Sequence, residues 1–163
     1  MLIQLKNKDK LIIADFKFRC CIGKNGTKKH KIEGDYSTPK GTFNLGCVYY
    51  RKDRVIKPNT KLKIKAIKLN MGWCNQPNHK FYNKEIKSLK NIKHEKLYRK
   101  DHKYDYLVVI KYNHKKTIPN KGSAIFIHLT KNYKPTAGCI ALKDKDLLIL
   151  LKLINKKTKI KIY

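Results

Sequence analysis

The sequence predicts a mainly β fold, a mixed-sheet barrel or sandwich with one helix near its end. Short apolar runs rich in β-branched and aromatic residues recur along the chain, turn residues separate them, and helical periodicity appears in one late segment. The chain has 163 residues, of which 41% are hydrophobic. This size and composition are typical of one globular domain, which we expect to span 1–163.

Eight segments have the alternating or continuous apolar pattern of half-buried or fully buried strands. They lie at 1–5, 10–18, 20–22, 42–50, 62–67, 106–112, 124–128 and 158–163. We expect the two segments 106–112 and 124–128 to pair. Glycine and proline punctuate 24–26 and 34–41, which predicts a turn and a loop. Residues 75–103 are polar with few apolar anchors, so we expect an excursion over a cleft.

The helical periodicity places Leu147, Leu150, Leu151 and Ile154 on one face. Asp144 precedes them and is expected to be the N-cap, because its carboxylate can accept free N–H groups of the first turn. The helix would pack directly behind residues 122–142.

Residues 122–142 bring a histidine and a cysteine to the ends of two apolar runs. His128 ends the run 124–127, and Gly138 precedes Cys139, where the missing side chain would let a substrate backbone approach the sulfur. An imidazole can hold a thiolate as an ion pair and later protonate a leaving amine. Equally, His128 could be bonded to backbone and Cys139 could be a buried small hydrophobic residue.

The same stretch resembles the active-site segment of the L,D-transpeptidase catalytic domain family (YkuD type). That segment is a histidine, a loop, then Ser/Thr-x-Gly-Cys and a hydrophobic residue. The matching positions are His128, Thr136, Gly138, Cys139 and Ile140. GDYSTPKGTF at 34–43 and GWC at 72–74 are similar to upstream family segments. The resemblance covers residues 15–163 and points to a compact branch without a signal peptide.

This resemblance implies acyl transfer through a thioester on peptidoglycan tetrapeptide stems. Cys139 would attack the carbonyl between a diamino acid and D-Ala, and His128 would move the proton, its ring oriented by the carbonyl of Leu129. Backbone N–H groups around Gly138 and Cys139 would hold the oxyanion, and Thr136 would bond within the turn. An amine acceptor gives a transpeptidase, whereas water gives an L,D-carboxypeptidase that acts on muropeptides.

Two departures from the family pattern lie beside the cysteine. Ala137 stands where the family often has histidine, and Ala141 stands where it has arginine or asparagine. Both remove polar groups from the substrate side without touching the nucleophile or the base. The substrate-contact candidates come from matched segments upstream. They are Trp73, Tyr82, Asn83, His94 and Glu95. Trp73 could belong to the core or to the cleft wall, and the core is the favoured interpretation.

The net charge of +29 would attract polyanions. Most of the 40 basic residues are lysines spread along the chain beside abundant isoleucine and asparagine, as AT-rich codon usage produces. Arginine, the better donor for phosphate recognition, is rare. A solvated lysine-rich surface is therefore expected, without a specific nucleic acid partner. A noncatalytic basic module that binds polyanions is the second alternative to the enzyme.

Five cysteines, including the adjacent Cys20 and Cys21, do not form a disulfide framework pattern and suit a reducing compartment. No zinc-ligand spacing appears, so we expect neither a metal nor a cofactor. The first twenty residues hold no long apolar run, so we expect no signal peptide and no membrane span. The expected location is cytoplasmic, or periplasmic through an unseen export route. The oligomeric state stays open.

Overall fold

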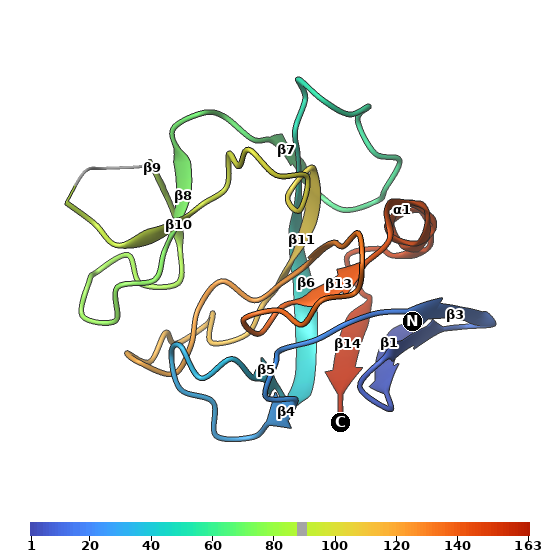
Figure 1. Ribbon diagram of the computed structural model, residues 1–163, viewed down its shortest axis with the longest axis horizontal. Coiled ribbons are helices and arrows are strands. Elements are labelled where there is room, and N and C mark those ends of the chain that lie inside the picture. The colour runs from blue at the N-terminus through green and yellow to red at the C-terminus, as the bar shows by residue number, and fades with distance from the viewer. Residues whose placement is uncertain (88–90) are drawn as a thin grey trace.

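The structure, a computed structural model, describes residues 1–87 and 91–163 and is mainly β (Figure 1). A large mixed sheet has the strand order β13-β12-β11-β6-β14-β1-β2-β3, with β7 beside β6. Its strands are β1 Leu2–Lys6, β2 Lys10–Ile13, β3 Phe16–Arg19, β6 Gly41–Tyr50, β7 Ile64–Ala66, β11 Tyr106–Ile110, β12 Phe126–Leu129, β13 Ile140–Leu142 and β14 Lys159–Ile162. The expected pairing of 106–112 with 124–128 is confirmed, since β11 and β12 are antiparallel neighbours.

The chain that follows β3 nearly closes this sheet into a barrel. Cys21 N–H donates to the carbonyl of Ala141 at 3.0 Å, and Ala141 N–H donates back at 2.8 Å. Gly23 forms a further bridge to Thr136. Residues 20–23 therefore cover the edge of β13 that would otherwise be free. The predicted mixed-sheet barrel is confirmed.

The central strands bury both faces, as strands between two layers do. On one face, Ile127, Ile140 and Leu142 pack in the same apolar core as the buried helix residues Leu147 and Leu150. The helix, α1, spans Asp144–Leu153 and follows β13 directly. On the other face, a second core contains aromatic and aliphatic residues with a sulfur among them. Its buried members are Tyr49, Ile67, Trp73, Leu97, Tyr104, Leu107, Val109, Phe126 and Cys139.

The second core lies under a small sheet with the order β10-β8-β9. Its strands are β8 Met71–Cys74, β9 Glu85–Lys87 and β10 His94–Lys96. Figure 1 shows this small sheet at the left of the molecule and α1 at the right. Residues 75–103, expected as an excursion over a cleft, contain β9 and β10, which the sequence did not indicate, and 88–90 lie outside the described residues. Strands of three residues are too short to show an alternating pattern. β4 Thr27–Lys28 and β5 Thr38–Pro39 form a separate short pair.

Three expected boundaries are wrong. The segment 10–18 is two strands, because Ala14 takes a left-handed conformation (φ 48°) and turns the chain between β2 and β3. The hairpin continues only to Cys20, whose N–H donates to the carbonyl of Asp9 at 2.7 Å, and Cys21 then bridges to Ala141. The N-cap of α1 is Lys143, without a side-chain hydrogen bond. Asp144 is the first helical residue, where its charge favours the positive end of the helix dipole.

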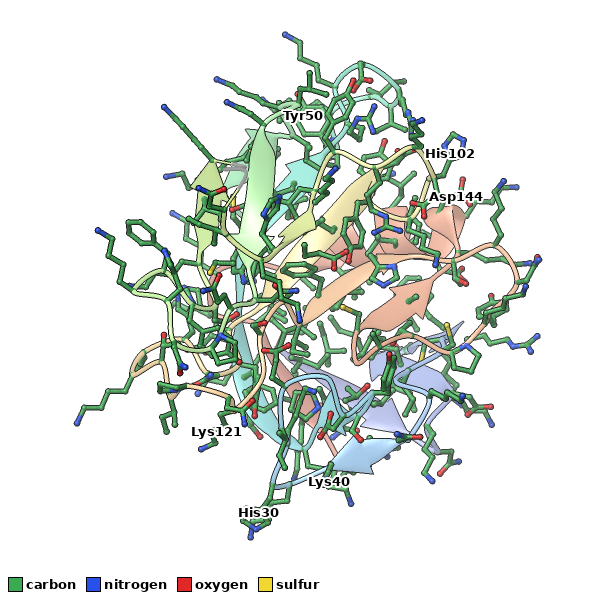
Figure 2. All side chains as sticks on the ribbon, turned by 60° about the vertical axis from the view of Figure 1, so that its left-hand side comes forward. His30, Lys40, Tyr50, His102, Lys121 and Asp144 are labelled. Atoms are coloured by element: carbon green, nitrogen blue, oxygen red, sulfur yellow. The ribbon has the colours of Figure 1, made fainter. Side chains whose placement is uncertain are left out.

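Long side chains tipped with nitrogen project outward around the molecule in Figure 2, so the positive charge surrounds the fold. In the described ranges, no helix combines the length and the apolar character needed to cross a bilayer.

Candidate active site

His128 and Cys139 come together because β12 and β13 are parallel neighbours. Their register pairs His128 with Ala141, so Cys139, two residues before Ala141, lies beside Phe126. Paired residues of adjacent strands share a face, as do alternate residues along one strand. His128 and Cys139 therefore lie on the same face, and both line a cavity of about 1260 Å³.

The Cys139 thiol is bonded to backbone. Phe126 N–H donates to Sγ at 3.3 Å, and the thiol donates to the carbonyl of Ala124 at 3.2 Å. Ala124 has a left-handed conformation (φ 53°), and its N–H is held by the side-chain oxygen of Asn83 at 3.1 Å. Within the described residues, the thiol and the imidazole of His128 are not hydrogen bonded to each other.

The His128 ring is fixed by its own strand and by an aromatic neighbour. Nδ1 lies 2.9 Å from the carbonyl of Leu129, which makes Nδ1 the protonated nitrogen and leaves Nε2 as an acceptor. The ring of Tyr104 lies edge-on, with its centroid 5.3 Å from that of His128. His128 thus has the tautomer that a general base for a thiol requires.

Burial holds both groups neutral at neutral pH. It raises the pKa of the Cys139 thiol to about 12, although the N–H of Phe126 opposes this. It lowers the pKa of His128 to about 4, against the effect of the Leu129 carbonyl. The thiolate–imidazolium pair expected from the sequence is therefore not the resting state. The residue pattern does not reveal how completely the two groups are desolvated.

The turn before Cys139 is closed by Thr136. Its hydroxyl donates to the carbonyl of Cys139 at 2.6 Å and accepts from Gly138 N–H at 3.1 Å. Gly138 has φ +143°, and a Cβ there would lie 2.8 Å from the carbonyl oxygen of Ser37. The glycine is therefore needed for packing against Ser37. The expectation that it lets a substrate backbone approach the sulfur stays a prediction.

The family model of the L,D-transpeptidase catalytic domain (YkuD) matches residues 2–162, which is nearly the whole chain. The chain belongs to the L,D-transpeptidase catalytic domain family. Searches of curated proteins and of solved structures returned no match. Proteins of this family in general catalyse L,D-transpeptidase-type reactions, and they act on peptidoglycan peptides.

A second wall of this L,D-transpeptidase-type cavity is built around Glu95. One carboxylate oxygen accepts from the Tyr104 hydroxyl at 3.1 Å and from Arg99 at 3.0 Å. Burial, then the proximity of Cys139 and Glu95, raises the pKa of Tyr104 well above its ordinary value, so the phenol stays protonated. Sequence reasoning named Glu95 but missed Tyr104 and Arg99 as site residues. The place of Tyr104 just before a buried strand was the available signal.

The other substrate-contact candidates lie outside the cavity lining. The Trp73 indole donates to Asn83 at 2.9 Å inside the second core. Asn83 also donates to backbone carbonyls. The Tyr82 hydroxyl donates to the carboxylate of Glu33, and His94 Nδ1 lies 2.5 Å from the carbonyl of Ile92. Their polar atoms have partners inside the fold, and their contact with substrate stays a prediction. Among the described residues, no group of three or more His, Cys, Asp or Glu side chains is placed to hold a metal ion.

The stability of the fold should decrease on acidification, because unfolding frees His128 to bind a proton. Its folded pKa of about 4 lies below the ordinary 6.5, so the stabilisation is complete above pH 6.5 and is lost as the pH falls towards 4. Acidification from pH 7 to pH 4 should therefore lower the free energy of unfolding by about 3 kcal/mol through this group. Urea unfolding at pH 7 and pH 4 should show a loss in wild type about 3 kcal/mol larger than in His128→Asn. Equal losses in the two proteins would contradict this.

Proposed function

We propose that the protein carries out cysteine-dependent acyl transfer on peptidoglycan tetrapeptide stems, breaking the bond between the diamino acid and D-Ala through a thioester. The observation that supports it is the placement of His128 and Cys139 on one face of the sheet, in one cavity, within a chain that belongs to the L,D-transpeptidase family. Cys139 is the nucleophile, and His128 is the general base and then the general acid.

The Cys139 thiol and the His128 imidazole are both neutral before substrate binds. The thiol must therefore lose its proton after substrate is in place. The thiol leaves the carbonyl of Ala124 and turns to Nε2 of His128. Its proton moves to Nε2 as Sγ forms a bond to the substrate carbonyl carbon. The carbonyl of Leu129 then stabilises the imidazolium through Nδ1–H. The imidazolium protonates the amine of D-Ala, the C–N bond breaks, and the thioester remains.

The negative oxygen of the tetrahedral intermediate needs a fixed donor. The N–H of Gly138 is already bonded to Thr136. We therefore assign this role to the N–H of Cys139, which the closed turn holds in place. A single donor of this kind contributes about 3 kcal/mol to transition-state stabilisation. Thr136 acts by closing the turn and does not contact substrate in this mechanism.

The acceptor of the acyl group determines which reaction the protein catalyses. The masses of the products identify the acceptor. Purified protein is incubated with a disaccharide tetrapeptide, with and without a second stem that carries a free amine. We expect loss of D-Ala and, with the amine present, a joined dimer, as in an L,D-transpeptidase. Loss of D-Ala without a dimer would assign water as the acceptor and an L,D-carboxypeptidase activity. No loss of D-Ala would contradict the proposed function and favour a noncatalytic polyanion-binding module.

A further inference from the structure

Glu33 is a carboxylate held in one position on the cavity wall. Its Oε2 accepts hydrogen bonds from the Tyr82 hydroxyl and from the Ser123 hydroxyl, the latter at 2.7 Å. Its backbone N–H donates to the carbonyl of Asn120 at 2.8 Å. The Tyr82 hydroxyl also accepts from Gly122 N–H at 2.9 Å, which fixes the direction of its own donation. Donors from two distant parts of the chain therefore preorganise the carboxylate.

The second oxygen of Glu33, Oε1, is unused by the described residues, and no described cation forms an ion pair with the side chain. This is unexpected in a chain with 40 basic and 11 acidic residues. Lys31 lies two residues away, but its ammonium is bonded to Asp35 at 2.6 Å and its side chain is 3% exposed. Asp35 therefore occupies Lys31, and Lys28 also lies 3.8 Å from Asp35, so neither lysine forms a described ion pair with Glu33.

Glu33 lies on the cavity beside the backbone that holds the thiol. Ser123 donates to Glu33, and the next residue, Ala124, accepts the hydrogen bond of Cys139. All four residues line the same cavity. The carboxylate of Glu33 and the thiol of Cys139 are therefore held by adjacent residues of one cavity wall.

We propose that Glu33 binds the protonated side-chain amino group of the diamino acid whose carbonyl is attacked. Glu33 thereby selects donor stems in which this amine is free. The position of the diamino acid rests on the proposed function. The charge-assisted hydrogen bond to Oε1 supplies the selectivity, and Tyr82 and Ser123 act by orienting the carboxylate.

Binding to an inactive protein tests this without turnover. In the Cys139→Ala background, calorimetry compares a tetrapeptide that has a free side-chain amine with the same peptide acetylated at that amine. Glu33→Gln keeps the acceptor for Tyr82 and Ser123 but removes the charge. We expect Glu33→Gln to weaken binding of the free-amine peptide about 10-fold and to leave the acetylated peptide unaffected.

Asp144→Asn is the matched control, because Asp144 also lines the cavity (labelled in Figure 2) and the change removes the same charge. It should leave both affinities unchanged. An equal effect of Glu33→Gln on the two peptides, or no measurable binding of the free-amine peptide, would overturn the inference. If Glu33→Gln does not fold, equal affinities of the Cys139→Ala protein for the two peptides would overturn it as well. Failure of the proposed function is seen separately, as absence of D-Ala release by wild-type protein.

Discussion

Cys139→Ala should reduce the release of D-Ala from a disaccharide tetrapeptide by about 10⁴-fold or more, because it removes the atom that forms the thioester. The change also removes two bonds of Sγ to backbone, to Phe126 and to Ala124, but leaves the chain path intact. The measurement is kcat/KM from released D-Ala, with circular dichroism to confirm folding.

The matched control is Cys47→Ala. Cys47 is a half-buried thiol on β6, bonded to the carbonyl of Lys63 at 3.1 Å, and it is outside the cavity lining. This variant should keep wild-type kcat/KM. Turnover that survives in Cys139→Ala, or that is lost equally in Cys47→Ala, would show that the chemistry does not depend on Cys139.

His128→Asn should reduce kcat by about 10² to 10⁴-fold with little change in KM, since the imidazole acts on the proton and not on substrate binding. The asparagine amide can still donate towards the carbonyl of Leu129, so the strand end should keep its shape. In wild type, activity should persist well below pH 6.5, because burial lowers the pKa of His128 to about 4 and keeps the base neutral. A wild-type activity that falls with an apparent pKa of 6.5, or a variant with normal kcat, would contradict this assignment.

Sequence patterns predicted the main strands well because those strands are buried and long enough to show their period. β11 is one example, with all five residues buried, and β6 is another, with ten residues. Sequence patterns failed to predict elements that depend on local backbone geometry or on pairing with a distant strand. Ala14 is not a residue type that signals a left-handed turn. β10 exists because it pairs with β8, which lies about twenty residues earlier in the chain.

The candidate site was predictable as a pair of residues but not as an environment. The motif spacing indicates His128 and Cys139, yet their neutral state follows from burial, which depends on the whole fold. Glu33 was missed because its partner Ser123 is 90 positions away in the chain. Trp73 was expected either in the core or in the cleft wall, and its indole lies in the second core, bonded to Asn83.

The most direct test of the account is the mass of the covalent intermediate in wild-type protein. Protein mixed with disaccharide tetrapeptide is quenched in acid, weighed intact, and then digested to locate the added mass. We expect a gain equal to the stem without D-Ala, carried by the peptide that contains Cys139 and absent after reaction with hydroxylamine, which cleaves thioesters. Release of D-Ala without any such adduct, or with the adduct on another cysteine, would contradict a thioester at Cys139.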